Sequence, residues 1–148
     1  MKLAQKSKLK IEEFFREYLS DEKFQLPEIC FYAGRLTQVL TSVLNTDGIT
    51  IGRRIFIFPG NFRFDENELL KLDPKLAVHE IAHVLQYQRE GFGRFLWLYM
   101  KSFLLNLKPK KKWDLISRTE AYLDIPYEIE AREIASKFKN WSKNRKIK

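Results

Sequence analysis

The feature that most constrains this chain is the stretch Ala77–Leu85, which contains both of its histidines. If the stretch is helical, His79 and His83 lie about 40° apart around the axis and about one turn apart along it, so both imidazoles can reach one cation. Glu80 projects on the same side. This H-E-x-x-H spacing is typical of two zinc ligands and a carboxylate that accepts a proton from metal-bound water. The alternative is two hydrogen-bonded histidines on an ordinary amphipathic helix.

The residues around the motif favour a helix with one buried face. Its apolar residues fall within an arc of about 100° opposite the histidines, so that one face can pack in a core while the other lines a site; they are Val78, Ile81, Ala82 and Leu85. Asp73 followed by Pro74 predicts an N-cap and a first helical residue. Gly91 or Gly93 is expected to end the helix.

Length and composition indicate a single domain over residues 1–148. With 148 residues and 45% hydrophobic content the chain can bury a core. The lone Cys30 forms no internal disulfide and the start lacks a secretory signal, so we expect a cytoplasmic protein. The net charge of +8 favours association and solubility without defining a function. Because no nucleic-acid-binding motif is found, we do not expect a nucleic-acid partner. The sequence does not indicate an oligomeric state.

The first half of the chain predicts helices around a small sheet. Residues 8–19 have the spacing of a packing helix, within an N-terminal segment that comprises residues 1–25. A strand is expected at 28–32, a helix at 35–44, and a β-hairpin with strands at 49–51 and 55–58. We expect the second hairpin strand to be an edge strand, which could bind an extended peptide by main-chain hydrogen bonds. An ordinary sheet strand without a binding role is at least as good an interpretation. The fold class is therefore α+β, with a small antiparallel or mixed sheet in 28–91 packed against the histidine helix.

The half from 92 to 148 is expected to be helical, and residues 92–107 are its most apolar stretch. Lys101 interrupts this stretch, which is too short to span a bilayer. Together with the lysines that follow, up to residue 112, it could lie on an anionic membrane surface. The alternative, which we favour, is a helix folded over the histidine helix as a component of the core.

Two histidines do not complete a catalytic zinc site, which normally has three protein ligands and an open position. Since the chain has no third histidine and its cysteine is remote, a carboxylate is expected to supply the third ligand. Glu128 and Glu130 are the candidates, because both lie on a later predicted helix that starts near Pro126.

The motif at 79–86 followed by Glu128-Ile129-Glu130-Ala131 resembles the gluzincin branch of zincin metallopeptidases, whose third ligand is a Glu in a later E-x-x-A helix. More narrowly, residues 28–135 are similar to small metallopeptidase-like domains of bacterial toxin and contractile-injection cargo proteins. The resemblance implies a minimal zincin-like fold and Zn²⁺ held by His79, His83 and Glu128. Arg132 stands where that family often has an acidic residue, so the resemblance does not say which group orients the histidines.

The resemblance also implies hydrolysis of a peptide or protein substrate. Glu80 would act as general base, and a tyrosine would stabilise the oxyanion. Tyr127 is the first candidate for that tyrosine because it precedes Glu128, and Tyr122 and Tyr87 follow. The alternative, which we favour for each of them, is an ordinary packing tyrosine. Two other functions stay open: a zinc-binding module without turnover, and an interaction module that uses residues 92–112 at a membrane surface.

Overall fold

The computed structural model describes residues 2–35, 37–38, 46–64 and 70–145. Its helices are α1 (Gln5–Leu19), α3 (Pro74–Glu90), α4 (Phe92–Leu107), α5 (Leu115–Leu123) and α6 (Pro126–Asn144), and two 3-10 turns are η1 (Pro59–Asn61) and η2 (Lys108–Lys110). Its strands are β1 (Cys30–Tyr32), β2 (Gly48–Ile51), β3 (Arg54–Ile57), β4 (Phe62–Phe64) and β5 (Leu70–Leu72). This arrangement confirms the predicted α+β class. Most of the helix predicted at 35–44 lies outside the described residues.

Three strands form a mixed sheet in the order β1-β3-β2. The predicted hairpin is confirmed, because β2 and β3 pair antiparallel across a turn in which Gly52 has a φ of 62°. The other side of β3 pairs in parallel with β1. The expectation that the second hairpin strand is an edge was therefore wrong: in the described sheet β3 is central, and β1 and β2 are its two outer strands.

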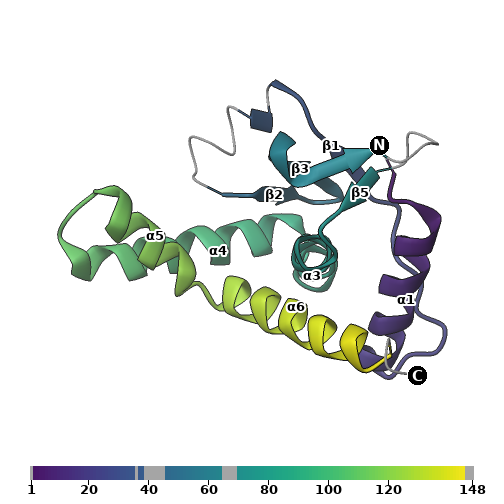
Figure 1. Cartoon of the computed structure of the whole chain (residues 1–148). Helices are drawn as coiled ribbons and strands as arrows, with labels where there is room; N and C mark the ends of the chain where they lie inside the picture. Colours follow the sequence, from purple (N-terminus) through teal and green to yellow (C-terminus); the bar gives the residue numbers. More distant parts are fainter. Residues whose placement is uncertain (1, 36, 39–45, 65–69, 146–148) are drawn as a thin grey trace.

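Helix α3 lies between the sheet and α6, as Figure 1 shows with α3 viewed along its axis. Its limits are those predicted from the sequence. The carboxylate of Asp73 accepts a hydrogen bond from the Lys75 backbone N–H at 3.1 Å, Pro74 is the first helical residue, and Gly91 caps the end. The predicted apolar face is buried, since Val78 and Ile81 have no exposed surface.

One hydrophobic cluster connects α1, the sheet, α3 and α6. Phe15 on α1 is fully buried, and so is Ile55 on β3. Near the C-terminal end of α6, the ring of Phe14 meets those of Phe138 and Trp141 at centroid distances of 5.2 and 5.6 Å. These contacts hold α1 against the C-terminal half of α6, far along the chain from it.

Helix α4 only partly fulfils the expectation that residues 92–107 complete the core. Phe95 and Leu107 are buried. Six other large apolar side chains of this helix are exposed: Phe92, Leu96, Trp97, Met100, Leu104 and Leu105. The reason is geometric, because α4 and α5 extend away from the sheet as an arm and only one side of α4 meets the rest of the molecule (Figure 1). Among the described residues, no helix has the length and apolarity that crossing a membrane requires.

We expect Phe15→Ala to lower the free energy of unfolding by about 3–5 kcal/mol, because it leaves a cavity where the ring is fully buried. Leu9→Ala on the same helix is the control, since Leu9 is 55% exposed and its truncation should cost less than about 0.5 kcal/mol. Urea denaturation measures both. Equal losses for the two variants would contradict the assignment of the core.

Candidate metal centre

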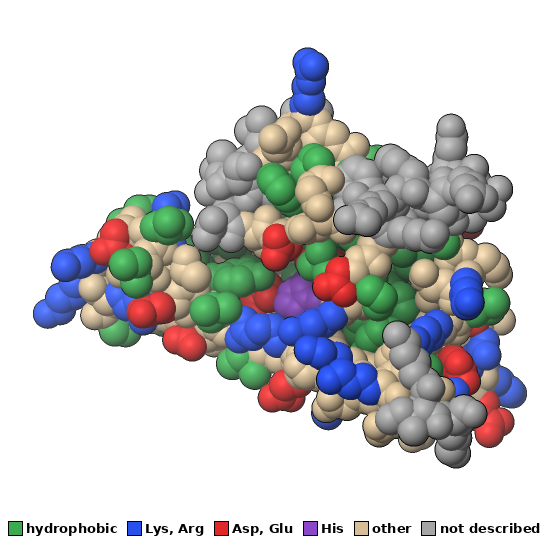
Figure 2. All heavy atoms as spheres, in the orientation of Figure 1, with side chains coloured by type: hydrophobic (Ala, Val, Ile, Leu, Met, Phe, Trp, Pro, Cys, Tyr) green, Lys and Arg blue, Asp and Glu red, His purple; other side chains and the backbone are tan. Residues whose placement is uncertain are grey.

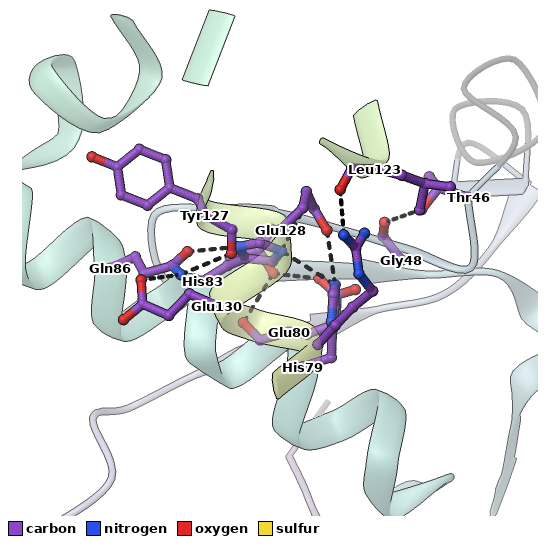
Figure 3. Close-up of polar contacts among 12 residues, drawn as sticks. Thr46, Gly48, His79, Glu80, His83, Gln86, Leu123, Tyr127, Glu128 and Glu130 are labelled. Carbon is purple, nitrogen blue, oxygen red and sulfur yellow. Dashed lines mark hydrogen bonds and ion pairs between the residues drawn. The ribbon is translucent and has the colours of Figure 1, made fainter. Parts of the chain in front are cut away.

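Three potential ligands from two helices converge on one point. His79 and His83 come from α3 and Glu128 from the first turn of α6. The Nε2 atoms of the two histidines are 3.3 Å apart. Glu128 Oε2 lies 3.3 Å from His79 Nε2, and Oε1 lies 3.1 Å from His83 Nε2. Figure 3 shows the three side chains pointing toward one another. Of the described residues, these three form a group that could hold a metal ion.

The separations fit a tetrahedral zinc site. Ligand atoms placed about 2.1 Å from zinc at tetrahedral angles are about 3.4 Å apart. The two Nε2 atoms are 3.3 Å apart, each faces a different oxygen of Glu128 at 3.1 or 3.3 Å, and one ligand atom from each residue lies within 4.8 Å of the other two. The carboxylate of Glu128 is buried, and its Oε2 lies 3.3 Å from His79 Nε2. A buried carboxylate is costly unless cations or hydrogen-bond donors neutralise it. The residues present therefore fit a zinc ion.

The orientation of His83 is set by an amide that the sequence did not point to. Gln86 is buried, and its Nε2 donates to the Tyr127 carbonyl and to Glu130 Oε2, both at 3.0 Å. Its Oε1 must then face His83 Nδ1, 2.8 Å away, and accept the hydrogen bond. With Nδ1 engaged by Gln86, Nε2 is the atom of His83 that faces Glu128 and that would bind a metal ion. A second hydrogen-bonding partner of this kind commonly orients a histidine ligand.

Glu130, the alternative third ligand, lies elsewhere. Its carboxylate makes two bonds with the guanidinium of Arg89, at 2.7 and 3.0 Å, in addition to the bond from Gln86. The hydrogen bonds from Arg89 are the largest cause that lowers the pKa of Glu130. Of the two candidates, the structure brings Glu128 to the histidines and uses Glu130 to hold Gln86. Glu130 therefore supports His83 indirectly.

Glu80 is buried beside the three ligands. Its Oε2 accepts a hydrogen bond from the Thr50 hydroxyl of β2 at 2.7 Å. Burial raises the pKa of Glu80, against the opposing charges of His83 and His79. Gly48 leaves room for this side chain, because a Cβ there would lie 2.5 Å from Glu80 Oε1. A buried carboxyl with a raised pKa is suited to accept and return a proton.

The charges of the ligand residues depend on one another. Burial lowers the pKa of His83, but the hydrogen bond and charge of Glu128 outweigh burial and raise this pKa to about 9. Burial raises the pKa of Glu128, but hydrogen bonds from both histidines and the charge of His83 outweigh it, so the pKa lies below its ordinary value. Glu128 is therefore ionised and available as an anionic ligand at neutral pH.

The tyrosine predicted for oxyanion stabilisation is not at the site. The Tyr127 ring packs on Phe95 of α4 at a centroid distance of 4.7 Å, and in Figure 3 it points away from His79 and Glu80. Tyr87 also packs on Phe95, at 4.1 Å. The candidate role of Tyr127 in oxyanion stabilisation was therefore wrong, and the alternative of a packing tyrosine agrees with the structure, because Phe95 of α4 holds its ring.

Two other tyrosines reach the site instead. Tyr99 of α4, which the sequence reasoning missed, donates a hydrogen bond to Glu128 Oε1 at 2.7 Å. Burial and then the charge of Glu128 raise the pKa of Tyr99, so its hydroxyl stays protonated and able to donate. The same two causes raise the pKa of Tyr122, one of the weaker sequence candidates. In the sequence, the only indication of a role for Tyr99 was its polar hydroxyl within the apolar stretch 92–107.

Arg132 has a structural contact in place of the acidic residue that the resemblance would favour. Its guanidinium donates to the carbonyl of Leu123 at the end of α5. This contact joins α5 to α6 four residues after Glu128. Gln86 of α3 orients His83 instead.

Comparison with known protein families assigns the chain. The family model of the eCIS core domain, named for the extracellular contractile injection system, matches residues 7–91. The match covers more than half of the chain, which therefore belongs to the eCIS core domain family. It runs from α1 to the end of α3, so it includes His79, Glu80 and His83 and ends before Glu128. No curated protein and no solved structure matches this chain.

We expect Glu128→Gln to weaken zinc binding by roughly tenfold or more, because it removes the anionic ligand. Glu130→Gln, which removes a charge that holds Gln86 and not a ligand, should weaken binding less, and Glu133→Gln at an exposed position of α6 is the neutral control. Titration with zinc against a competing chelator measures these affinities. Equal affinity of wild type and Glu128→Gln, or a larger loss in Glu130→Gln, would contradict the ligand assignment.

Gly48→Ala should lower the free energy of unfolding by about 1–3 kcal/mol, because the new methyl group overlaps the buried carboxylate of Glu80. Gly93→Ala is the control. A Cβ at Gly93 meets nothing within 4 Å, and alanine favours the helix by up to about 1 kcal/mol. Thermal denaturation compares the two. A stable Gly48→Ala protein would show that Glu80 is not confined as described.

Proposed function

We propose that this domain is a zinc-dependent peptidase. The observation that carries the proposal is the convergence of His79, His83 and Glu128 at one point, with the buried carboxylate of Glu80 next to it. A zinc ion at this point would supply Lewis acidity, which polarises a water molecule and a substrate carbonyl. The gluzincin resemblance of the same residues supports this assignment.

Glu80 is the proposed general base. Its raised pKa suits a group that takes a proton from the attacking water and returns it to the leaving amine. The Thr50 hydroxyl holds one oxygen of the carboxylate, and the proposal assigns the reacting water to the other. Removing such a base typically reduces the rate by about 10²–10⁴-fold.

The surroundings of the site offer groups for the rest of the reaction. The hydroxyls of Tyr99 and Tyr122 are protonated donors near Glu128, and they are the candidates for stabilising the oxyanion. An extended peptide could add beside β2, the edge strand that carries Thr50. Main-chain hydrogen bonds along this strand would bring a peptide bond toward Glu80.

A second candidate function is a zinc-binding module without turnover. It is favoured by the burial of the ligands, since the side chains of His79, His83 and Glu128 are 16%, 7% and 2% exposed. In Figure 2 a histidine is visible at the surface among acidic and basic side chains, with little of it uncovered. Structural zinc sites are closed, whereas catalytic sites keep a position for water.

Glu80→Gln separates the two functions. In the zinc-loaded protein we expect this variant to cleave a peptide library roughly 100-fold or more slowly than wild type while it still binds one zinc per chain. Glu133→Gln, at an exposed position of α6, should leave cleavage unchanged. Mass spectrometry of the products measures cleavage. A zinc-loaded wild-type protein that cleaves nothing, or a Glu80→Gln variant as active as wild type, would contradict the peptidase.

A further inference from the structure

The end of the arm formed by α4 and α5 exposes a group of large apolar side chains. We define the arm tip as residues 104–116, at the end of the arm farthest from α3 (Figure 1). Its exposed apolar residues are Leu104, Leu105, Trp113, Leu115 and Ile116, with exposed fractions between 51% and 71%. Exposed apolar side chains gathered in one place usually mark an interaction surface.

The same segment is strongly basic. It contains Lys108, Lys110, Lys111 and Lys112 but one acidic residue, Asp114, so it holds +3 of the chain's net charge of +8. Asp114 accepts the backbone N–H of Ser117 and so caps α5. Lys110 pairs with Glu120 at 2.6 Å. In Figure 2 Lys and Arg side chains project beside hydrophobic ones over the arm.

We propose that the arm tip docks on the surface of a membrane that contains anionic phospholipids. Trp113, Leu115 and Ile116 enter the boundary between headgroups and acyl chains, where tryptophan is particularly favourable. The neighbouring lysines contact the phosphate and carboxylate groups of the lipids. The domain then lies on one leaflet, since no described helix is able to span the bilayer.

The composition of the tip favours a membrane over a protein partner. Protein interfaces are depleted in lysine and enriched in arginine, whereas every basic residue of the tip is a lysine. A second copy of the chain would bring two positively charged tips together, which is electrostatically unfavourable. An anionic bilayer, in contrast, complements both the apolar and the basic side chains.

The tip is separate from the candidate metal centre. The base of the arm is fixed to the site by Tyr99, which bonds to Glu128, and by Phe95, whose ring lies 6.4 Å from that of His83. Tyr99 lies eight residues before Leu107, the last residue of α4, so the lysines that follow Leu107 start about 12 Å farther along the helix axis. Substitutions at the tip should therefore leave zinc binding unchanged, and vesicle binding needs no catalytic activity.

Sedimentation with vesicles tests the proposal. The full chain is mixed with phosphatidylcholine vesicles that contain phosphatidylserine as about one lipid in three, and with vesicles of phosphatidylcholine alone. The charge variant is Lys108→Gln/Lys111→Gln/Lys112→Gln. Its control, Lys23→Gln/Lys139→Gln/Lys143→Gln, removes the same charge at exposed positions elsewhere. The apolar variant is Ile116→Ser, and its control is Leu9→Ser on α1.

We expect wild type and both controls to sediment with the anionic vesicles and to bind phosphatidylcholine vesicles weakly. The charge variant should bind roughly tenfold or more weakly than its control, and Ile116→Ser should also lose binding. No binding of wild type to anionic vesicles would overturn the proposal, as would equal losses in a variant and its control. Dimers in analytical ultracentrifugation that Ile116→Ser dissociates, without vesicle binding, would assign the tip to a second copy of the chain.

Discussion

The site depends on one constraint. The carboxylate of Glu128 packs against the imidazoles of His79 and His83, across the interface between α3 and α6. A carboxylate as buried as Glu128 is unfavourable unless cations or donors surround it. His79, His83 and Tyr99 provide that environment from two other helices. Because Pro126 starts α6 two residues earlier, the carboxylate stands in the first helical turn, where its position is rigid.

Helices α3 and α6 also meet through the buried core. Ala131 and Ala135 of α6 are buried in the same hydrophobic cluster as Val78 and Ile81 of α3. On its opposite side α3 meets β2, whose Thr50 holds Glu80. The histidine helix is thus fixed between a helix that carries Glu128 and a strand whose Thr50 holds Glu80.

The sequence predicted those features that depend on neighbouring residues. The limits of α3 follow from Asp73 and Gly91, and the hairpin follows from alternating strands around Gly52. Contacts between distant segments were harder to predict. The choice of Glu128 over Glu130 depends on the rotation of α6 about its axis, and spacing alone left both open.

The contacts of the tyrosines were even harder to predict from the sequence. Tyr127 follows Pro126 and precedes Glu128. Nevertheless, the ring of Tyr127 packs on Phe95 of α4 and points away from His79. Tyr99 reaches Glu128 only because α4 leaves α3 after Gly91 in the direction that passes the start of α6 (Figure 1). No local pattern predicts the direction in which a helix leaves such a turn, so neither contact could be derived from the sequence. The same direction leaves the outer side of α4 exposed.

X-ray absorption at the zinc edge of the zinc-loaded protein tests the central claim most directly. The account predicts a first shell of nitrogen and oxygen at about 2.0–2.2 Å, with the outer-shell scattering of two imidazole rings. A sulfur ligand at about 2.3 Å, which Cys30 would have to supply, would contradict the account. So would a shell of oxygen atoms without imidazole scattering.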